Sequence, residues 1–224
     1  MAAVFRTRAK KFLIEARRNL NTVVLIFNPY QTSRILFVGS ANPINVQALE
    51  WILGAVFPHI QKKRADSELV VAGEVGRVRR WPNWLSLPGN QDSLVDTYAR
   101  AAVVINPVKF GTGLPVKTIE ALSHGKPTVA TSAGGRGLED FSDAISVADD
   151  PDTFTGRVLE LLECKDTRLK ISERALAAAS EWQRHQLIAL DAAIIGQKPA
   201  YPKEAPIARD DEILYNPARK SNSL

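Results

Sequence analysis

The chain has 224 residues, of which 45% are hydrophobic and 24% charged, enough for one globular domain with a full core or for two small domains. The formal net charge of +5 is concentrated at the amino end, where residues 1–18 hold six Arg and Lys against one Glu. Because this basic excess falls on no nucleic-acid-binding motif, we expect no nucleic-acid partner.

Cys164 is the only cysteine, so an internal disulfide is excluded and a reducing compartment is expected. Charged residues interrupt every apolar stretch near the start, which argues against a secretory signal. No apolar run approaches the roughly 18 residues of a membrane-spanning helix. These features together predict a cytoplasmic protein.

The first 33 residues are predicted to form a basic amphipathic helix and a lead-in strand. Six apolar residues recur at helical spacing between Arg and Lys side chains: Phe5, Ala9, Phe12, Leu13, Ala16 and Leu20. Such a helix packs against its own domain, lies on an anionic membrane surface, or acts as an organelle transit peptide. We favour packing on the domain, with peripheral membrane contact of residues 1–20 as the second interpretation.

Residues 34–196 are predicted to form one Rossmann-like α/β domain, because short apolar runs alternate with helical patterns. Strands are expected at 35–38, 68–72, 84–87, 101–105, 128–131 and 144–147. Helices are expected at 43–56, 93–98, 116–123 and about 150–162, with one long helix or a pair at 169–195. Residues 197–224, which contain four prolines, are expected to form a flexible tail.

The segment 109–135 combines a glycine loop with a short helix. The loop contains Gly111, Thr112, Gly113 and Leu114. Its glycines allow the backbone to approach a ligand, and N–H groups in the first turn of the helix at 116–123 attract an anion. Lys117 adds a positive charge in that turn, and Glu120 can accept hydrogen bonds from sugar hydroxyls. A phosphate next to a polyhydroxyl group indicates a nucleotide or a nucleotide sugar.

Several segments resemble, in order, the carboxyl-terminal donor-binding domain of retaining GT-B glycosyltransferases of the family 4 type. The central segment is FGTGLPVKTIEALSHGKPTVAT, and around it lie ILFVGSANPINVQALEWILGAVFPHI, ELVVAGEVG, WLSLPG, DSLVDTYARAAVVINP and GGRGLED. The resemblance covers residues 34–181 and implies a single three-layer αβα domain with a mostly parallel sheet, one half of a GT-B fold. It also implies a retaining, hexosyltransferase-like enzyme that binds a nucleoside-diphosphate sugar and needs no metal or other cofactor.

The resemblance further implies which residues bind the donor. They are Gly39, Ser40, Gly111, Thr112, Gly113, Leu114, Lys117 and Glu120. Glu120 corresponds to the family glutamate that binds the donor ribose, and a surface ion pair with Lys117 is the alternative. The family's first glutamate is replaced by Thr112, and its usual Arg and Lys are absent from residues 39–42. Lys117 is therefore expected to meet the diphosphate.

Only the donor half of a GT-B enzyme is recognised in these residues, so no catalytic residue is assigned. An acceptor-domain polypeptide is therefore expected as a partner. The alternative is a non-catalytic nucleotide-sugar binding or regulatory module that pairs with a full enzyme. A dehydrogenase-type domain is disfavoured, since neither glycine loop matches G-x-G-x-x-G. His124 is expected at the surface or as a helix cap, and no role is assigned to it.

Overall fold

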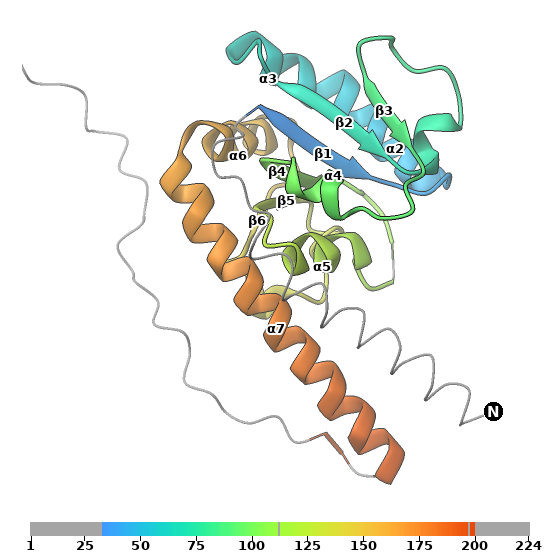
Figure 1. Ribbon diagram of the computed structural model, residues 1–224, viewed down its shortest axis with the longest axis vertical. Helices are drawn as coiled ribbons and strands as arrows, with labels where there is room; N and C mark the ends of the chain where they lie inside the picture. Colours follow the sequence, from blue (N-terminus) through green and yellow to red (C-terminus); the bar gives the residue numbers. More distant parts are fainter. Residues whose placement is uncertain (1–32, 112, 197, 200–224) are drawn as a thin grey trace, which may run out of the picture. The chain divides into compact units, whose positions relative to one another are not determined.

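The computed structural model describes residues 33–111, 113–196 and 198–199 (Figure 1). The predicted basic helix with its lead-in strand, Thr112 and almost all of the predicted tail lie outside the described residues. Membrane contact of residues 1–20 therefore stays a prediction, as do the domain limits 1–33, 34–196 and 197–224. Within the described residues, no helix is both long enough and apolar enough to cross a membrane.

Six parallel strands form one sheet, so the predicted α/β fold class is confirmed (Figure 1). They are β1 (Arg34–Val38), β2 (Glu68–Ala72), β3 (Ser86–Gly89), β4 (Val103–Asn106), β5 (Thr128–Ala130) and β6 (Ile145–Val147). The order β3-β2-β1-β4-β5-β6 reverses direction between β1 and β4, where Leu36 pairs with Val104. Open α/β sheets bind ligands at such a switch point, outside the carboxyl ends of the strands.

Three strands begin later than predicted, β3 and β4 by two residues and β6 by one. The sequence pattern places a strand at 84–87, but β3 starts at Ser86. A turn occupies the preceding residues, closed by a hydrogen bond from the Leu85 N–H to the Pro82 carbonyl (3.0 Å). Trp84 is instead exposed and stacks on Phe57, with ring centroids 5.2 Å apart.

Helices connect the strands. They are α2 (Pro43–Trp51), α3 (Phe57–Lys63), α4 (Val95–Ala99), α5 (Val116–Ser123), α6 (Pro151–Glu163) and α7 (Lys165–Ile195), with a π turn η1 (Ile52–Val56) and 3-10 turns η2 (Glu74–Arg77) and η3 (Glu139–Phe141). The predicted helix at 43–56 continues through η1 into α3, because Pro58 falls in the first turn of α3, where its missing N–H is not required. Helix α5 has the predicted bounds and ends before Gly125, whose φ is 61°.

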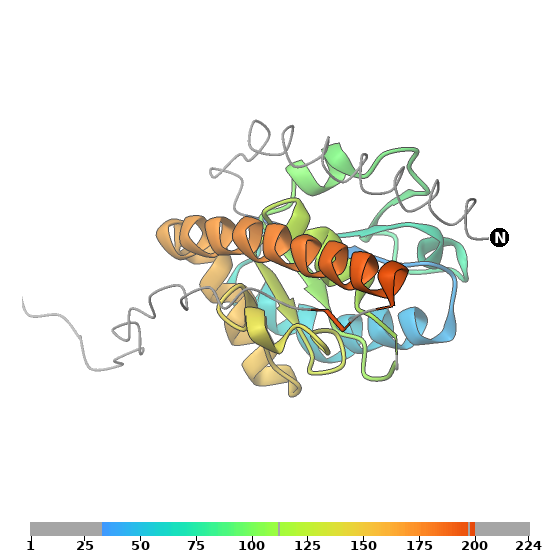
Figure 2. The same cartoon turned by 90° about the horizontal axis from the view of Figure 1, so that it is seen from below.

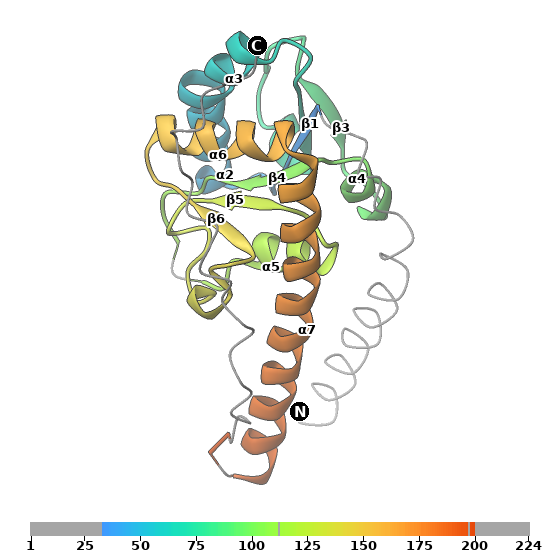
Figure 3. The ribbon, with the colours of Figure 1, turned by 90° about the vertical axis from the view of Figure 1, so that its left-hand side faces the viewer.

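The helices bury both faces of the sheet. In β1, Ile35 and Phe37 pack with apolar residues of α2, α3 and α6, whereas Leu36 packs with residues of α4 and α5. Figure 3 shows the layers, with α2 and α6 on one side of the sheet and α5 on the other. The predicted three-layer αβα arrangement is therefore confirmed.

Helix α7 is one continuous helix of 31 residues rather than a pair (Figure 2). Its residues Ala175, Ala178 and Ala179 pack in a cluster with Ile119 and Leu122 of α5. The compact unit that contains the sheet ends at Trp182, and the remainder of α7 belongs to a second unit.

Candidate functional site

Lys117 reaches from α5 across the switch point to the carboxyl end of β1. Its Nζ donates a hydrogen bond to Asn45 Oδ1 in the first turn of α2. The same Nζ lies 5.2 Å from the centre of the Phe37 ring in β1. Because α5 follows β4 and α2 follows β1, this side chain joins the segments that flank the switch point, where an α/β sheet binds ligands.

Asn45 is the buried link in this arrangement, with only 2% of its surface exposed. Its Nδ2 donates to the Ser40 carbonyl (3.0 Å) and to Ser40 Oγ (3.1 Å). A Cβ on Gly39 would lie 3.3 Å from Asn45 Cβ, so the absence of a side chain at position 39 allows this close packing. Three of the predicted residues, Gly39, Ser40 and Lys117, therefore meet around Asn45.

Among the described residues, no carboxylate forms an ion pair with Lys117. In the part of the chain that the structure describes, its contacts are a neutral carboxamide and an aromatic ring, and it forms no ion pair. Burial lowers the pKa of the Lys117 ammonium to about 8, because removal from water disfavours the charged form. Lys117 is therefore still mostly charged at neutral pH, and a bound anion would stabilise that charge.

The glycine loop between β4 and α5 is exposed. Gly111, Gly113 and Leu114 all lie at the surface, and a Cβ on either glycine would meet no atom within 4 Å. Arg136 Nη1 donates to the Gly111 carbonyl (2.6 Å) and so ties the loop to the segment after β5. Within the described residues, no hydrogen bond joins this loop to Ser40 or Lys117, and Thr112 lies outside those residues.

The predicted free N–H groups in the first turn of α5 are largely occupied, which corrects the sequence interpretation. The Val116 N–H donates to the Leu114 carbonyl (2.8 Å), and the Thr118 N–H donates to the Pro115 carbonyl (2.9 Å). Pro115 is the cap of the helix, with ψ of 68°, and lies before its first turn. The helix end therefore offers fewer free N–H groups to an anion than the sequence predicts.

A buried polar network anchors the start of α5. Asn106 Nδ2 donates to Thr118 Oγ1 (2.9 Å) and to the Gly134 carbonyl (3.3 Å), and Thr118 Oγ1 donates to the same carbonyl (2.6 Å). A Cβ on Gly134 would lie 2.3 Å from the Asn106 carbonyl oxygen, so glycine is required there. The network joins β4, α5 and the turn after β5, and it holds the turn that carries Lys117.

The Glu120 side chain accepts a hydrogen bond from α4. Tyr98 Oη donates to Glu120 Oε2 at 3.0 Å. Burial raises the pKa of the Glu120 carboxyl, and the hydrogen bond from Tyr98 opposes that rise. The described residues contain no ion pair between Glu120 and Lys117, so the alternative of a surface ion pair is wrong.

His124 is buried, which corrects the expectation of a surface residue. It caps the carboxyl end of α5, as the other alternative had it, but only 7% of its surface is exposed. Its ring stacks on that of Tyr98, with centroids 4.4 Å apart and an interplanar angle of 11°. Burial, together with nearby Lys126, lowers the pKa of His124 to about 4, so the ring is neutral at pH 7.

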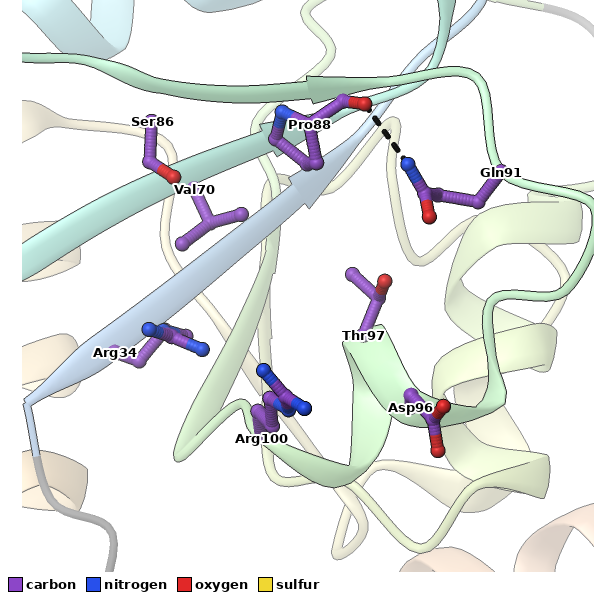
Figure 4. A pocket seen from close by; sticks show the side chains of 8 residues that line it. All are labelled: Arg34, Val70, Ser86, Pro88, Gln91, Asp96, Thr97 and Arg100. Atoms are coloured by element: carbon purple, nitrogen blue, oxygen red, sulfur yellow. Dashed lines mark hydrogen bonds between the residues drawn. The ribbon is translucent and has the colours of Figure 1, made fainter.

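A separate pocket lies beside α4, over β2 and β3 (Figure 4). Its lining consists of Arg34, Val70, Ser86, Pro88, Gln91, Asp96, Thr97 and Arg100. None of the predicted donor-binding residues lines it, and Arg34 is already paired with Glu68 at 2.9 Å. The candidate site is therefore at the strand ends and not in this pocket.

Sequence reasoning missed Asn45 and Tyr98. Asn45 could have been recognised from the sequence, because it lies three residues after the helix-capping Asn42, in the first turn of the helix that follows β1. Tyr98 carried no signal toward Glu120, since the pair is separated by 22 positions and joins two different helices.

Comparison with known proteins gives the family. Residues 32–164 match the family model for glycosyl transferases group 1. An uncharacterized 44.6 kDa protein in the cps region of Klebsiella pneumoniae is 27% identical over 139 residues, which are 56% of this chain and 36% of that protein.

Solved structures share the fold, among them those of S. aureus TarM and Anabaena HepE. The match to S. aureus TarM has a TM-score of 0.61 at 13% identity. It covers 74% of this chain and 35% of the TarM chain. The match to Anabaena HepE, solved in complex with UDP and glucose, has a TM-score of 0.58 at 13% identity. It covers 79% of this chain and 52% of the HepE chain. The chain thus spans between about a third and about half of the length of the relatives it matches. Because the family model covers more than half of the sequence, this chain belongs to the glycosyl transferases group 1 family.

Proposed function

We propose that this chain binds the donor, a nucleoside-diphosphate sugar, for a glycosyltransferase. The observation that carries the proposal is the half-buried ammonium of Lys117, held by Asn45 at the switch point without a carboxylate partner among the described residues. The diphosphate is the anionic part of such a donor and complements this cation. Membership of the family and the UDP in the HepE and TarM structures support the proposal.

Lys117 and Glu120 would bind different parts of the donor. They lie three residues apart on α5, but they face different neighbours, Asn45 and Tyr98. We assign Lys117 to the diphosphate and Glu120 to the ribose hydroxyls. The backbone at Gly39 and Ser40, and that of the exposed glycine loop, would complete the site around the phosphates and the sugar, since little side-chain bulk bars a ligand from that backbone.

The proposed reaction is the transfer of a hexosyl group, with retention of configuration, to an acceptor. Negative charge develops on the departing diphosphate in the transition state, and a pre-oriented ammonium stabilises it. In this proposal Lys117 takes the place of a metal ion. The acceptor site is assigned to another domain or polypeptide, without which the same donor site would serve as a binding or regulatory module.

Calorimetric titration with UDP, GDP, ADP and NAD tests the proposal. One nucleoside diphosphate is expected to bind, and Lys117→Gln or Glu120→Gln is expected to weaken its binding by about tenfold or more, the effect of removing one charged hydrogen-bonding partner. A chelator is expected to leave the affinity unchanged.

Matched controls are Lys62→Gln on α3 and Glu163→Gln on α6, which change the same charges at exposed positions. These variants should bind as the wild type does. Binding of NAD alone would instead favour a dehydrogenase-type domain. Diphosphate binding that survives Lys117→Gln would locate the ligand elsewhere on the chain.

A further inference from the structure

A buried tyrosine holds one oxygen of the carboxylate that we assign to the donor ribose. Tyr98 has no exposed surface, yet its hydroxyl donates to Glu120 Oε2 at 3.0 Å. Its ring packs in the apolar cluster with Leu36 and Val104 and stacks on His124 at 4.4 Å. A ring packed in this way keeps a fixed position, and its hydroxyl therefore constrains the carboxylate to which it donates.

The surroundings of Glu120 leave this phenol as its hydrogen-bond donor. The backbone N–H of His124 donates to the Glu120 carbonyl (3.1 Å), so the two residues lie one turn apart on α5, and both side chains contact Tyr98. The His124 ring is neutral at pH 7 and supplies no counter-charge. Within the described part of the chain, the Glu120 side chain makes no hydrogen bond besides that from Tyr98, so Oε1 has no hydrogen-bond partner there.

We propose that Tyr98 is a positioning residue that occupies Glu120 Oε2 and thereby presents Oε1 to the ribose hydroxyls of the donor, an inference that rests on the proposed function. Tyr98 itself is buried and does not touch the ligand. The consequence is selectivity: the site binds a ribonucleotide more tightly than the same nucleotide without its ribose hydroxyls, and Tyr98 sets the size of that preference.

Tyr98→Phe tests the inference, because it keeps the ring and its stacking and removes only the hydroxyl. The dissociation constants to compare are those of the tightest-binding diphosphate among UDP, GDP and ADP and of its 2′,3′-dideoxy analogue. For the wild type, the analogue is expected to bind about tenfold more weakly or worse. Tyr98→Phe is expected to weaken the ribonucleotide severalfold and to leave the affinity of the analogue unchanged.

The analogue serves as an internal control. Equal weakening of both ligands would show a general structural role for Tyr98 and would overturn the inference. The inference would also be overturned if Glu120→Gln abolished the preference for the ribonucleotide and Tyr98→Phe left that preference unchanged. The proposed function would still stand in that case. The double variant should lose no more of the preference than Glu120→Gln does alone, because the two residues act on one contact.

A measurement without nucleotide checks the contact itself. Since the hydrogen bond from Tyr98 lowers the pKa of the Glu120 carboxyl, Tyr98→Phe is expected to raise that pKa, as measured by carbon-13 NMR of the side-chain carboxyl. An unchanged pKa would overturn the inference even if both nucleotides bound as expected. If the wild type bound none of the diphosphates, the proposed function would fail and the inference with it.

Discussion

Binding of the nucleoside diphosphate is expected to weaken as the pH rises through 8, because binding requires the charged form of Lys117. Burial lowers the pKa of this ammonium to about 8 in the free chain. With that pKa, roughly nine-tenths of the molecules carry the charge at about pH 7 and roughly one-tenth at about pH 9. If only the charged form binds, the dissociation constant rises about tenfold over this range, which corresponds to about 1.4 kcal/mol of binding free energy.

Because protonation of Lys117 and binding of the diphosphate are linked, each favours the other. A bound diphosphate favours the ammonium and raises the pKa of Lys117, so the complex takes up protons near pH 8. The ligand contributes little, since the second ionisation of a phosphate group lies near about pH 6. His124, with a pKa of about 4, does not titrate in this range, but buried Lys126, with a pKa of about 8, does.

Calorimetry at several pH values, in two buffers of different ionisation enthalpy, measures both the affinity and the proton uptake. The wild type should lose affinity and take up protons as calculated, and Lys117→Gln should bind weakly with a flat profile. A pH-independent wild type would refute the reasoning. A slope that persists in Lys117→Gln would also refute it, because it would assign the titration to Lys126 or another group.

Three further predictions concern substitutions around the site. Lys117→Met is expected to abolish nucleotide binding and to raise the free energy of unfolding by about 1 kcal/mol, because it removes a charge whose burial destabilises the fold. A denaturant titration that showed destabilisation would contradict this prediction. Asn45→Asp is expected to raise the pKa of Lys117 and to weaken diphosphate binding, since the new carboxylate competes for the ammonium. NMR titration of the lysine side chain measures this pKa. An unchanged pKa would argue against the contact between Lys117 and residue 45. Gly134→Ala is expected to destabilise the chain by more than about 2 kcal/mol, because the new Cβ clashes with the Asn106 carbonyl. The control, Gly113→Ala, should change stability by less than about 0.5 kcal/mol, since its Cβ meets no atom. Equal melting temperatures of the two variants would contradict this prediction.

The fold could be predicted because its signals are local. Apolar periodicity and a terminal glycine define α5, whose observed bounds match the prediction, and Gly125 adopts the positive φ that a helix-ending glycine requires. The start of β3 could not be predicted, because the apolar residues at Trp84 and Leu85 belong to a turn and not to the sheet. An apolar run alone does not distinguish the two.

Lys117 and Glu120 were predicted as site residues from the sequence, but their contacts with Asn45 and Tyr98 were not. Lys117 and Glu120 lie three positions apart on one helix, and that spacing favours a mutual ion pair. In the folded chain, Lys117 instead reaches α2 and Glu120 meets α4, because β1 and β4 are neighbours in the sheet. His124 is likewise buried, and Tyr98 of another helix stacks on it. These contacts depend on packing between segments far apart in the sequence.

Chemical-shift mapping of the isotope-labelled chain during titration with UDP, GDP or ADP tests most directly whether the donor site lies at the switch point between β1 and β4. The account predicts that the backbone signals of Ser40 and Gly113 and the side-chain signals of Lys117 and Glu120 shift together and saturate with one dissociation constant. Shifts confined to the pocket of Figure 4, around residues such as Arg100, would contradict the account and place the nucleotide in that pocket instead.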